Sequence, residues 1–164
     1  MTKLPIQKRY YPLWWLLQGI AQLPFSILYF ISDGLFFVLY FLVGYRKKVV
    51  FQNLQNAFPD KTKAEQRAIA QQFYRNLTDI ILETIKLAAI TPENLKERVK
   101  ILNPEVIEAA TTHGELVLAL GGHQGNWEWA PSGGIFYLNC PIDVVYKPLS
   151  NSFFEFLSGG PERA

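Results

Sequence analysis

The chain has 164 residues, of which 49% are hydrophobic and 18% charged, and its formal net charge is +2. This length suits one domain, and so small a net charge does not by itself suggest a nucleic-acid partner, so none is expected. The single cysteine, Cys140, excludes an internal disulfide and a cysteine-rich zinc site. The charge is uneven: residues 1–50 hold six basic residues against the single acid Asp33, a net of +5, which leaves −3 for the remainder.

The N-terminal segment, residues 10–45, carries one charge in 36 residues. Bulky aromatic residues continue to its end, where a signal peptide would have small residues at a cleavage site, so we expect the segment to be retained. Residues 25–43 approach the ~20 that cross a bilayer core, but Pro24 and Asp33-Gly34 interrupt the apolar run. We therefore expect residues 1–45 to form a membrane anchor, as one spanning helix or as two interfacial helices broken near Pro24.

Aromatic and basic residues flank this anchor. Trp14 and Trp15 favour the headgroup level of a membrane, and basic clusters at residues 3–9 and 46–48 would attract anionic phospholipid. Because both ends are basic, they give no preferred orientation. The alternative is a buried helical hairpin of a soluble protein.

Residues 46–164 have the composition of a globular domain, and their first half predicts helices. Thr62 and Glu65 have the spacing of a capping box at the start of a long helix. Thr91-Pro92 and Asn103-Pro104 each place a good N-cap before a proline, which predicts two short helices, the second ending near Gly114. The apolar stripe of the long helix is expected to face the core, and it comprises Ile69, Phe73, Leu77, Ile80, Ile81, Thr84 and Leu87 or Ala88.

Two apolar runs, Leu116–Leu120 and Ile142–Tyr146, read as β-strands. About 20 residues separate them, the length of a crossover helix, although Pro131 and two following glycines require that helix to be short or kinked. We therefore expect an α/β fold in which helices precede a βαβ unit of a parallel sheet.

Between these runs lies GGHQGNWE, residues 121–128, at the expected carboxyl end of the first strand, where α/β sheets place their ligands. Five residues along a helix would put His123 and Glu128 ~140° apart, so the two side chains meet only on a non-helical path. Gly121, Gly122 and Gly125 permit such a path, and Asn126 is expected to cap the helix that carries Glu128.

A carboxylate bonded to one imidazole nitrogen fixes the tautomer and leaves the other nitrogen to take a proton from a hydroxyl. The backbone N–H groups of the glycines before His123 could face a developing oxyanion. A structural histidine is the alternative. With His113 the only other histidine, a zinc site is poorly supported, and the sequence lacks a P-loop and a Gly-x-Ser-x-Gly elbow.

Taken together, these segments resemble the late acyltransferases of lipid A biosynthesis, relatives of the glycerolipid acyltransferases that share a His-x4-Asp/Glu motif. The motif here is H123-Q-G-N-W-E128. The segments that occur in the order of that family, over roughly residues 10 to 156, are the aromatic anchor, GYRKKVVFQNLQNAFP, FYRNLTDIILETIKL and VYKPLSN.

The resemblance implies a membrane enzyme at the cytoplasmic face of the inner membrane. It would move a fatty acyl group from acyl carrier protein, or from coenzyme A, to a hydroxyl of a lipid A precursor, with no metal or redox cofactor. His123 would be the base and Glu128 its orienting partner, while Lys147 would bind phosphate or stabilise thioester charge. Asn126 would support the turn or orient the acceptor, and Gly122 would contribute to substrate binding.

Two further expectations follow from the resemblance. Family members are nearly twice as long, and LSGGPERA after Phe156 departs from their pattern, so the chain is expected to be a fragment or a truncated product. The alternatives are a glycerolipid or aminolipid acyltransferase, or an inactive truncated module bound to the membrane.

Overall fold

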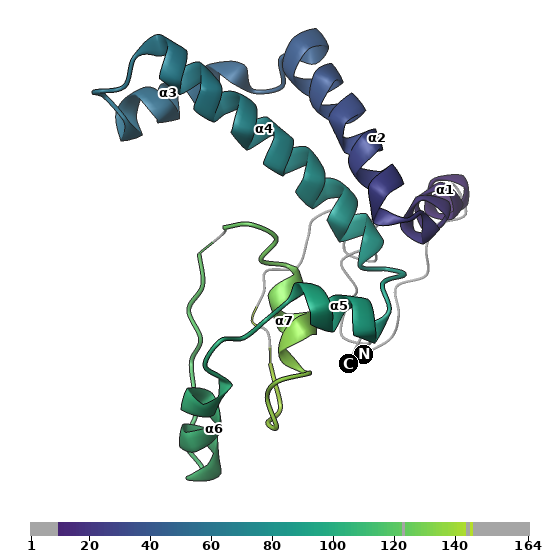
Figure 1. The fold of residues 1–164 in the computed structure, drawn as a ribbon, viewed down its shortest axis with the longest axis vertical. Helices are drawn as coiled ribbons and strands as arrows, with labels where there is room; N and C mark the ends of the chain where they lie inside the picture. Colours follow the sequence, from purple (N-terminus) through teal and green to yellow (C-terminus); the bar gives the residue numbers. More distant parts are fainter. Residues whose placement is uncertain (1–9, 123, 144, 146–164) are drawn as a thin grey trace.

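The computed structural model describes residues 10–122, 124–143 and 145, and that part of the chain is helical (Figure 1). Helices α2 and α4 lie side by side, α1 and α3 contact α4, and α5 contacts α7. The helices are α1 (Tyr11–Gln22), α2 (Phe25–Phe37), α3 (Lys47–Ala57), α4 (Lys63–Lys86), α5 (Pro92–Arg98), α6 (Pro104–Thr112) and α7 (Trp129–Gly134). A π-helical turn, η2 (Val38–Val43), extends α2.

The apolar N-terminal segment contains two helices that meet at Leu23 and Pro24. Proline lacks an N–H group and cannot continue α1, whereas it can precede the first turn of α2. Asp33 and Gly34 lie within α2, which runs through them. The segment Phe25–Val43 is long and apolar enough to cross a membrane, judged by length and composition alone. Of its most apolar stretch, 22% is buried inside the protein.

The capping box is confirmed: the Thr62 side chain accepts from the Glu65 backbone N–H, and the Glu65 carboxylate accepts from that of Thr62. The predicted core stripe of α4 is correct in part: Leu77 packs against the core, whereas Phe73 and Ile81 are exposed. The buried face consists of Ala70, Tyr74, Thr78 and Leu82, next to the predicted positions. Small side chains at two of these positions allow neighbouring helices to approach closely, and the Thr78 hydroxyl bonds to carbonyls of its own helix, which removes the cost of burying it.

The two short helices begin as predicted, α5 after Thr91 and α6 after Asn103, and α6 ends before Gly114, which has φ +76°. Helix α7 is short, as expected from its proline and glycines. Gly133 has a packing role: a Cβ there would collide with the side chain of Val99 at the end of α5. Its missing side chain therefore allows α5 and α7 to touch.

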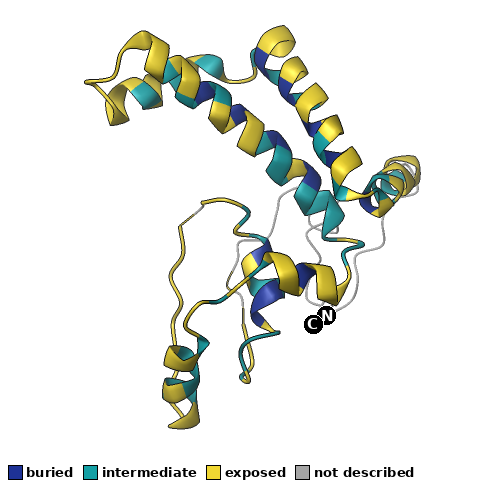
Figure 2. Ribbon diagram, in the orientation of Figure 1, coloured by how far each residue is buried: buried dark blue, intermediate teal, exposed yellow. Residues whose placement is uncertain are grey.

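The predicted α/β fold is wrong for the described residues, which form no strand and no sheet. The run Leu116–Leu120 lies open to solvent, with Leu116 97% and Leu118 76% exposed (Figure 2). The described residues of Ile142–Tyr146 also form no strand. A strand depends on hydrogen bonds to a neighbouring strand. The apolar, β-branched composition of these two runs was therefore not sufficient to make them strands. Helix α7 accordingly does not connect two parallel strands as a crossover helix.

Candidate active site

Of the five residues predicted to form the site, Gly122, Asn126 and Glu128 are among the described residues. His123 and Lys147 lie outside them. The contact between His123 and Glu128 and the role of Lys147 therefore stay predictions.

The segment that leads to Glu128 is a non-helical turn. Gly125 has φ +56°, a conformation that glycine adopts readily, and the Gly122 carbonyl accepts from the Gln124 N–H at 2.9 Å. Glu128 is half-buried and occupies the N-cap position of α7. It therefore sits where the turn enters the helix.

Asn126 does not cap α7 with its side chain, contrary to expectation. Its backbone carbonyl accepts from the Trp129 N–H at 3.2 Å, while its side-chain Nδ2 donates to Glu83 Oε2 at 2.8 Å. The carboxylate of Glu83 is a stronger acceptor than a neutral group, which explains why the amide turns toward α4. Asn126 Oδ1 is buried and has no hydrogen-bond partner among the described residues.

Glu83 joins three segments of the chain. Its Oε1 accepts from the Tyr29 hydroxyl of α2 at 2.7 Å, its Oε2 from Asn126, and its backbone carbonyl from Trp129 Nε1 at 3.2 Å. We call these four residues the Glu83 cluster. Burial, and then the bond to the Glu83 carboxylate, raise the pKa of Tyr29 to about 12. The phenol therefore stays protonated and donates at neutral pH.

Phe25, at the start of α2, packs against Trp129 of the Glu83 cluster. Its ring meets the buried Trp129 ring edge-on at 6.2 Å, and the Arg98 guanidinium lies 3.5 Å from its centre. Lys86 also approaches this ring, and its Nζ donates to the carbonyls of Ala21 and Leu23 at 2.9 and 3.0 Å. The break between α1 and α2 is thereby fixed to the end of α4.

Sequence reasoning missed Glu83 and Tyr29. Glu83 lies among Ile81, Leu82 and Ile85 in the FYRNLTDIILETIKL segment. An acid in so apolar a turn is a signal that it has a partner, because unpaired buried charges are costly. That partner, Asn126, lies 43 residues away in the sequence, so no local sequence pattern identifies it.

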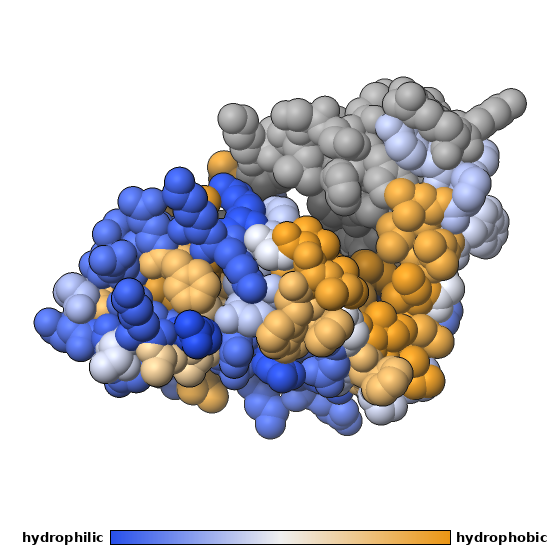
Figure 3. All heavy atoms as spheres, turned by 90° about the horizontal axis from the view of Figure 1, so that it is seen from above, coloured by the Kyte–Doolittle hydropathy of each residue, from blue (hydrophilic) through white to orange (hydrophobic). Residues whose placement is uncertain are grey.

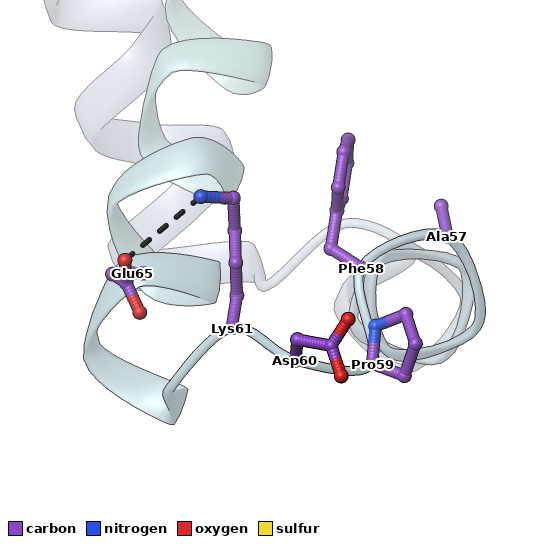
Figure 4. Close-up of a pocket in the computed structure, with 6 residues that line it drawn as sticks. All are labelled: Ala57, Phe58, Pro59, Asp60, Lys61 and Glu65. Atoms are coloured by element: carbon purple, nitrogen blue, oxygen red, sulfur yellow. Dashed lines mark ion pairs between the residues drawn. The ribbon is translucent and has the colours of Figure 1, made fainter.

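A surface depression lies at the turn between α3 and α4 (Figure 4). It is lined by Ala57, Phe58, Pro59, Asp60, Lys61 and Glu65. Lys61 Nζ faces the Glu65 carboxylate at 3.8 Å, and both side chains are exposed to solvent. The depression contains no histidine or nucleophile and lies at the opposite end of α4 from Glu83. No set of three His, Cys, Asp or Glu side chains in the described part of the chain could hold a metal ion.

The family comparison covers both the anchor and the turn. Residues 5–151 match the family described as bacterial lipid A biosynthesis acyltransferase. Because this match spans most of the sequence, the chain belongs to that family, as the resemblance of its segments indicated. The comparisons with curated proteins and with solved structures give no significant match.

Proposed function

We propose that this chain carries out O-acyl transfer in lipid A biosynthesis, moving a fatty acyl group from acyl carrier protein, or from coenzyme A, to a hydroxyl of a lipid A precursor. The reaction takes place at the cytoplasmic face of the inner membrane. The observation that carries the proposal is the family match, which includes the His123 to Glu128 motif. No metal or redox cofactor is needed, because a thioester is already activated.

In the proposed reaction, the His123 imidazole takes the proton of the acceptor hydroxyl while the oxygen attacks the thioester carbonyl. The tetrahedral oxyanion receives hydrogen bonds from the backbone N–H groups of Gly121 and Gly122. The C–S bond then breaks, and the proton passes from His123 to the thiolate. Glu128 orients the imidazole and stabilises its charged form.

Two described features support this arrangement. The Glu83 cluster fixes Asn126 and Trp129, which lie on either side of Glu128, so the acid side chain starts from a defined backbone position. Asn126 Oδ1 is buried and lacks a partner among the described residues, and we assign it to a donor of the acceptor lipid other than the reacting hydroxyl, whose single proton goes to His123. Lys147 is assigned to the phosphate of the precursor or to the thioester.

The two histidines provide a matched test. Membranes containing the protein are incubated with labelled acyl carrier protein thioester and lipid A precursor, and glycerol phosphate lipid or an aminolipid replaces the precursor in parallel reactions. His123→Ala should lower transfer by about a hundredfold or more, because a general base is lost. His113→Ala should leave it unchanged, since His113 is exposed at the end of α6.

Equal effects of the two variants would contradict the role of His123. Preferred transfer to the other acceptors would assign the chain to glycerolipid or aminolipid acylation. Absence of product with every acceptor would indicate a membrane module without activity.

A further inference from the structure

Helix α2 and its extension η2 carry two different faces. The face toward α4 is buried and includes Leu28, Ser32, Phe36 and Tyr40, each four residues from the last. The opposite face is apolar and exposed, and it comprises Ile27, Phe30, Ile31, Phe37, Val38 and Phe41. Figure 3 shows apolar residues gathered on the side of the molecule formed by α1 and α2.

Polar contacts along one side of α2 connect that helix to α4. The pairs are Asp33 with Arg75 at 2.9 Å, Ser32 with Asp79 at 2.6 Å, and Tyr29 with Glu83 at 2.7 Å. The α4 members are four residues apart and therefore share one face of that helix. We call these three pairs the polar ladder.

Helix α4 accompanies the apolar segment along its whole length. At one end Lys86 lies 5.4 Å from the Phe25 ring, and at the other the Tyr40 and Tyr74 rings are 5.3 Å apart. A segment of 19 residues measures about 28 Å, close to the ~30 Å of a bilayer core. If the segment crossed the bilayer with this packing intact, α4 would cross with it.

Helix α4 cannot occupy hydrocarbon. Arg75 is half exposed and Gln72 and Asn76 are exposed on its surface, and such groups have no hydrogen-bond partners among lipid chains. Crossing would therefore require α2 to leave α4 and abandon the polar ladder, which would also break the Glu83 cluster at Tyr29.

We propose that α1, α2 and η2 form a monotopic docking surface for an anionic phospholipid bilayer, in which α2 lies along one leaflet and does not cross it. The apolar face enters the acyl boundary while α4 stays on the aqueous side. Trp15, which is 67% exposed on α1, suits the headgroup level, and the exposed Arg46 and Lys48 just beyond η2 attract anionic headgroups. This inference does not depend on the proposed chemistry.

Cysteine labelling tests the topology. In a Cys140→Ser background, single cysteines replace Gln22 and Lys48, which are exposed at the two ends of the segment. Spheroplasts and broken membranes are treated with a membrane-impermeant maleimide. Both positions should behave alike, protected in intact spheroplasts and labelled after lysis. Labelling of only one position in intact spheroplasts would show a crossing helix and overturn the inference.

The other labelling outcomes separate this inference from the proposed function. Labelling of both positions in intact spheroplasts would support one-sided docking but contradict catalysis at the cytoplasmic face. Recovery of the protein in the soluble fraction would overturn the inference, because something other than lipid would then cover the apolar face.

A second measurement tests which face binds. Phe30→Glu and Val106→Glu both alter exposed apolar residues, 79% and 65% accessible, but Val106 lies on α6, away from α2 (Figure 1). Binding to vesicles of phosphatidylethanolamine and phosphatidylglycerol is measured by sedimentation, with circular dichroism to check folding. Phe30→Glu should weaken binding about tenfold or more, while Val106→Glu should not. Equal binding by both variants would overturn the inference.

Discussion

At the scale of single residues, Glu83 has the most influence on the candidate site. It receives hydrogen bonds from α2, from the turn and from the first residue of α7, so one carboxylate aligns the anchor with the motif. The role of Glu83 depends on contacts with residues far away in the sequence, which the sequence alone does not reveal. The sequence shows only an acidic residue among aliphatic neighbours.

Replacing Glu83 by alanine should destabilise the protein by about 1–3 kcal/mol, because the Tyr29 hydroxyl and the Asn126 amide lose their acceptor. Acyl transfer should fall with it. Glu83→Gln should retain more of both, since the Tyr29 hydroxyl can rotate to accept from the new amide. Thermal unfolding and transfer rate measure these effects, with the exposed Glu97→Ala as the control. Equal behaviour of the alanine and glutamine variants would count against the hydrogen-bonding role.

Tyr29 predicts a dependence of stability on alkaline pH. Its pKa is raised to about 12 by burial and by the Glu83 carboxylate, above the value of about 10 in an unfolded chain. The stabilisation is therefore complete below pH 10 and is lost as pH rises through 12. Tyr29→Phe should flatten the loss of unfolding free energy over this range, measured by urea titration. An unchanged slope would show that the phenol titrates normally.

At the scale of elements, the sequence patterns that correctly predicted helix boundaries are local ones. Thr62 with Glu65, Thr91-Pro92, and Pro24 each act within a few residues, and each begins or ends a helix as expected. The predicted strands failed because Leu116–Leu120 finds no pairing partner in the described chain. The turn of glycines was predictable from composition, but the preference of Asn126 for Glu83 over α7 was not.

The contact between α5 and α7 gives a prediction at this scale. Gly133→Ala should cost about 1–3 kcal/mol of unfolding free energy, because the new Cβ would collide with Val99. Adding Val99→Ala should restore part of the loss. Gly19→Ala is the control, since its Cβ would meet nothing within 4 Å in helix α1, where alanine is favoured. If the two glycine variants were equally stable, the close approach would be wrong.

At the scale of the whole molecule, the polar ladder and the Glu83 cluster are continuous through Tyr29 and Glu83. The apolar surface, helix α4 and the turn before Glu128 are therefore held in one arrangement. For an enzyme whose acceptor is a membrane lipid, this would place the motif at a fixed height relative to the bilayer surface. Composition alone left spanning and interfacial anchors equally open, because the contacts on which we base the proposed interfacial anchor join residues more than 40 positions apart.

The most direct test of the central claim, that Glu128 orients a histidine base, is the steady-state kinetics of Glu128→Gln across pH with acyl carrier protein thioester and lipid A precursor. Glu115→Gln, an exposed acid before the apolar run, serves as the control. The account predicts a kcat for Glu128→Gln at least tenfold lower, with KM little changed and an inflection of the wild-type rate near the pKa of histidine. An effect confined to KM, or a wild-type rate without that inflection, would contradict it.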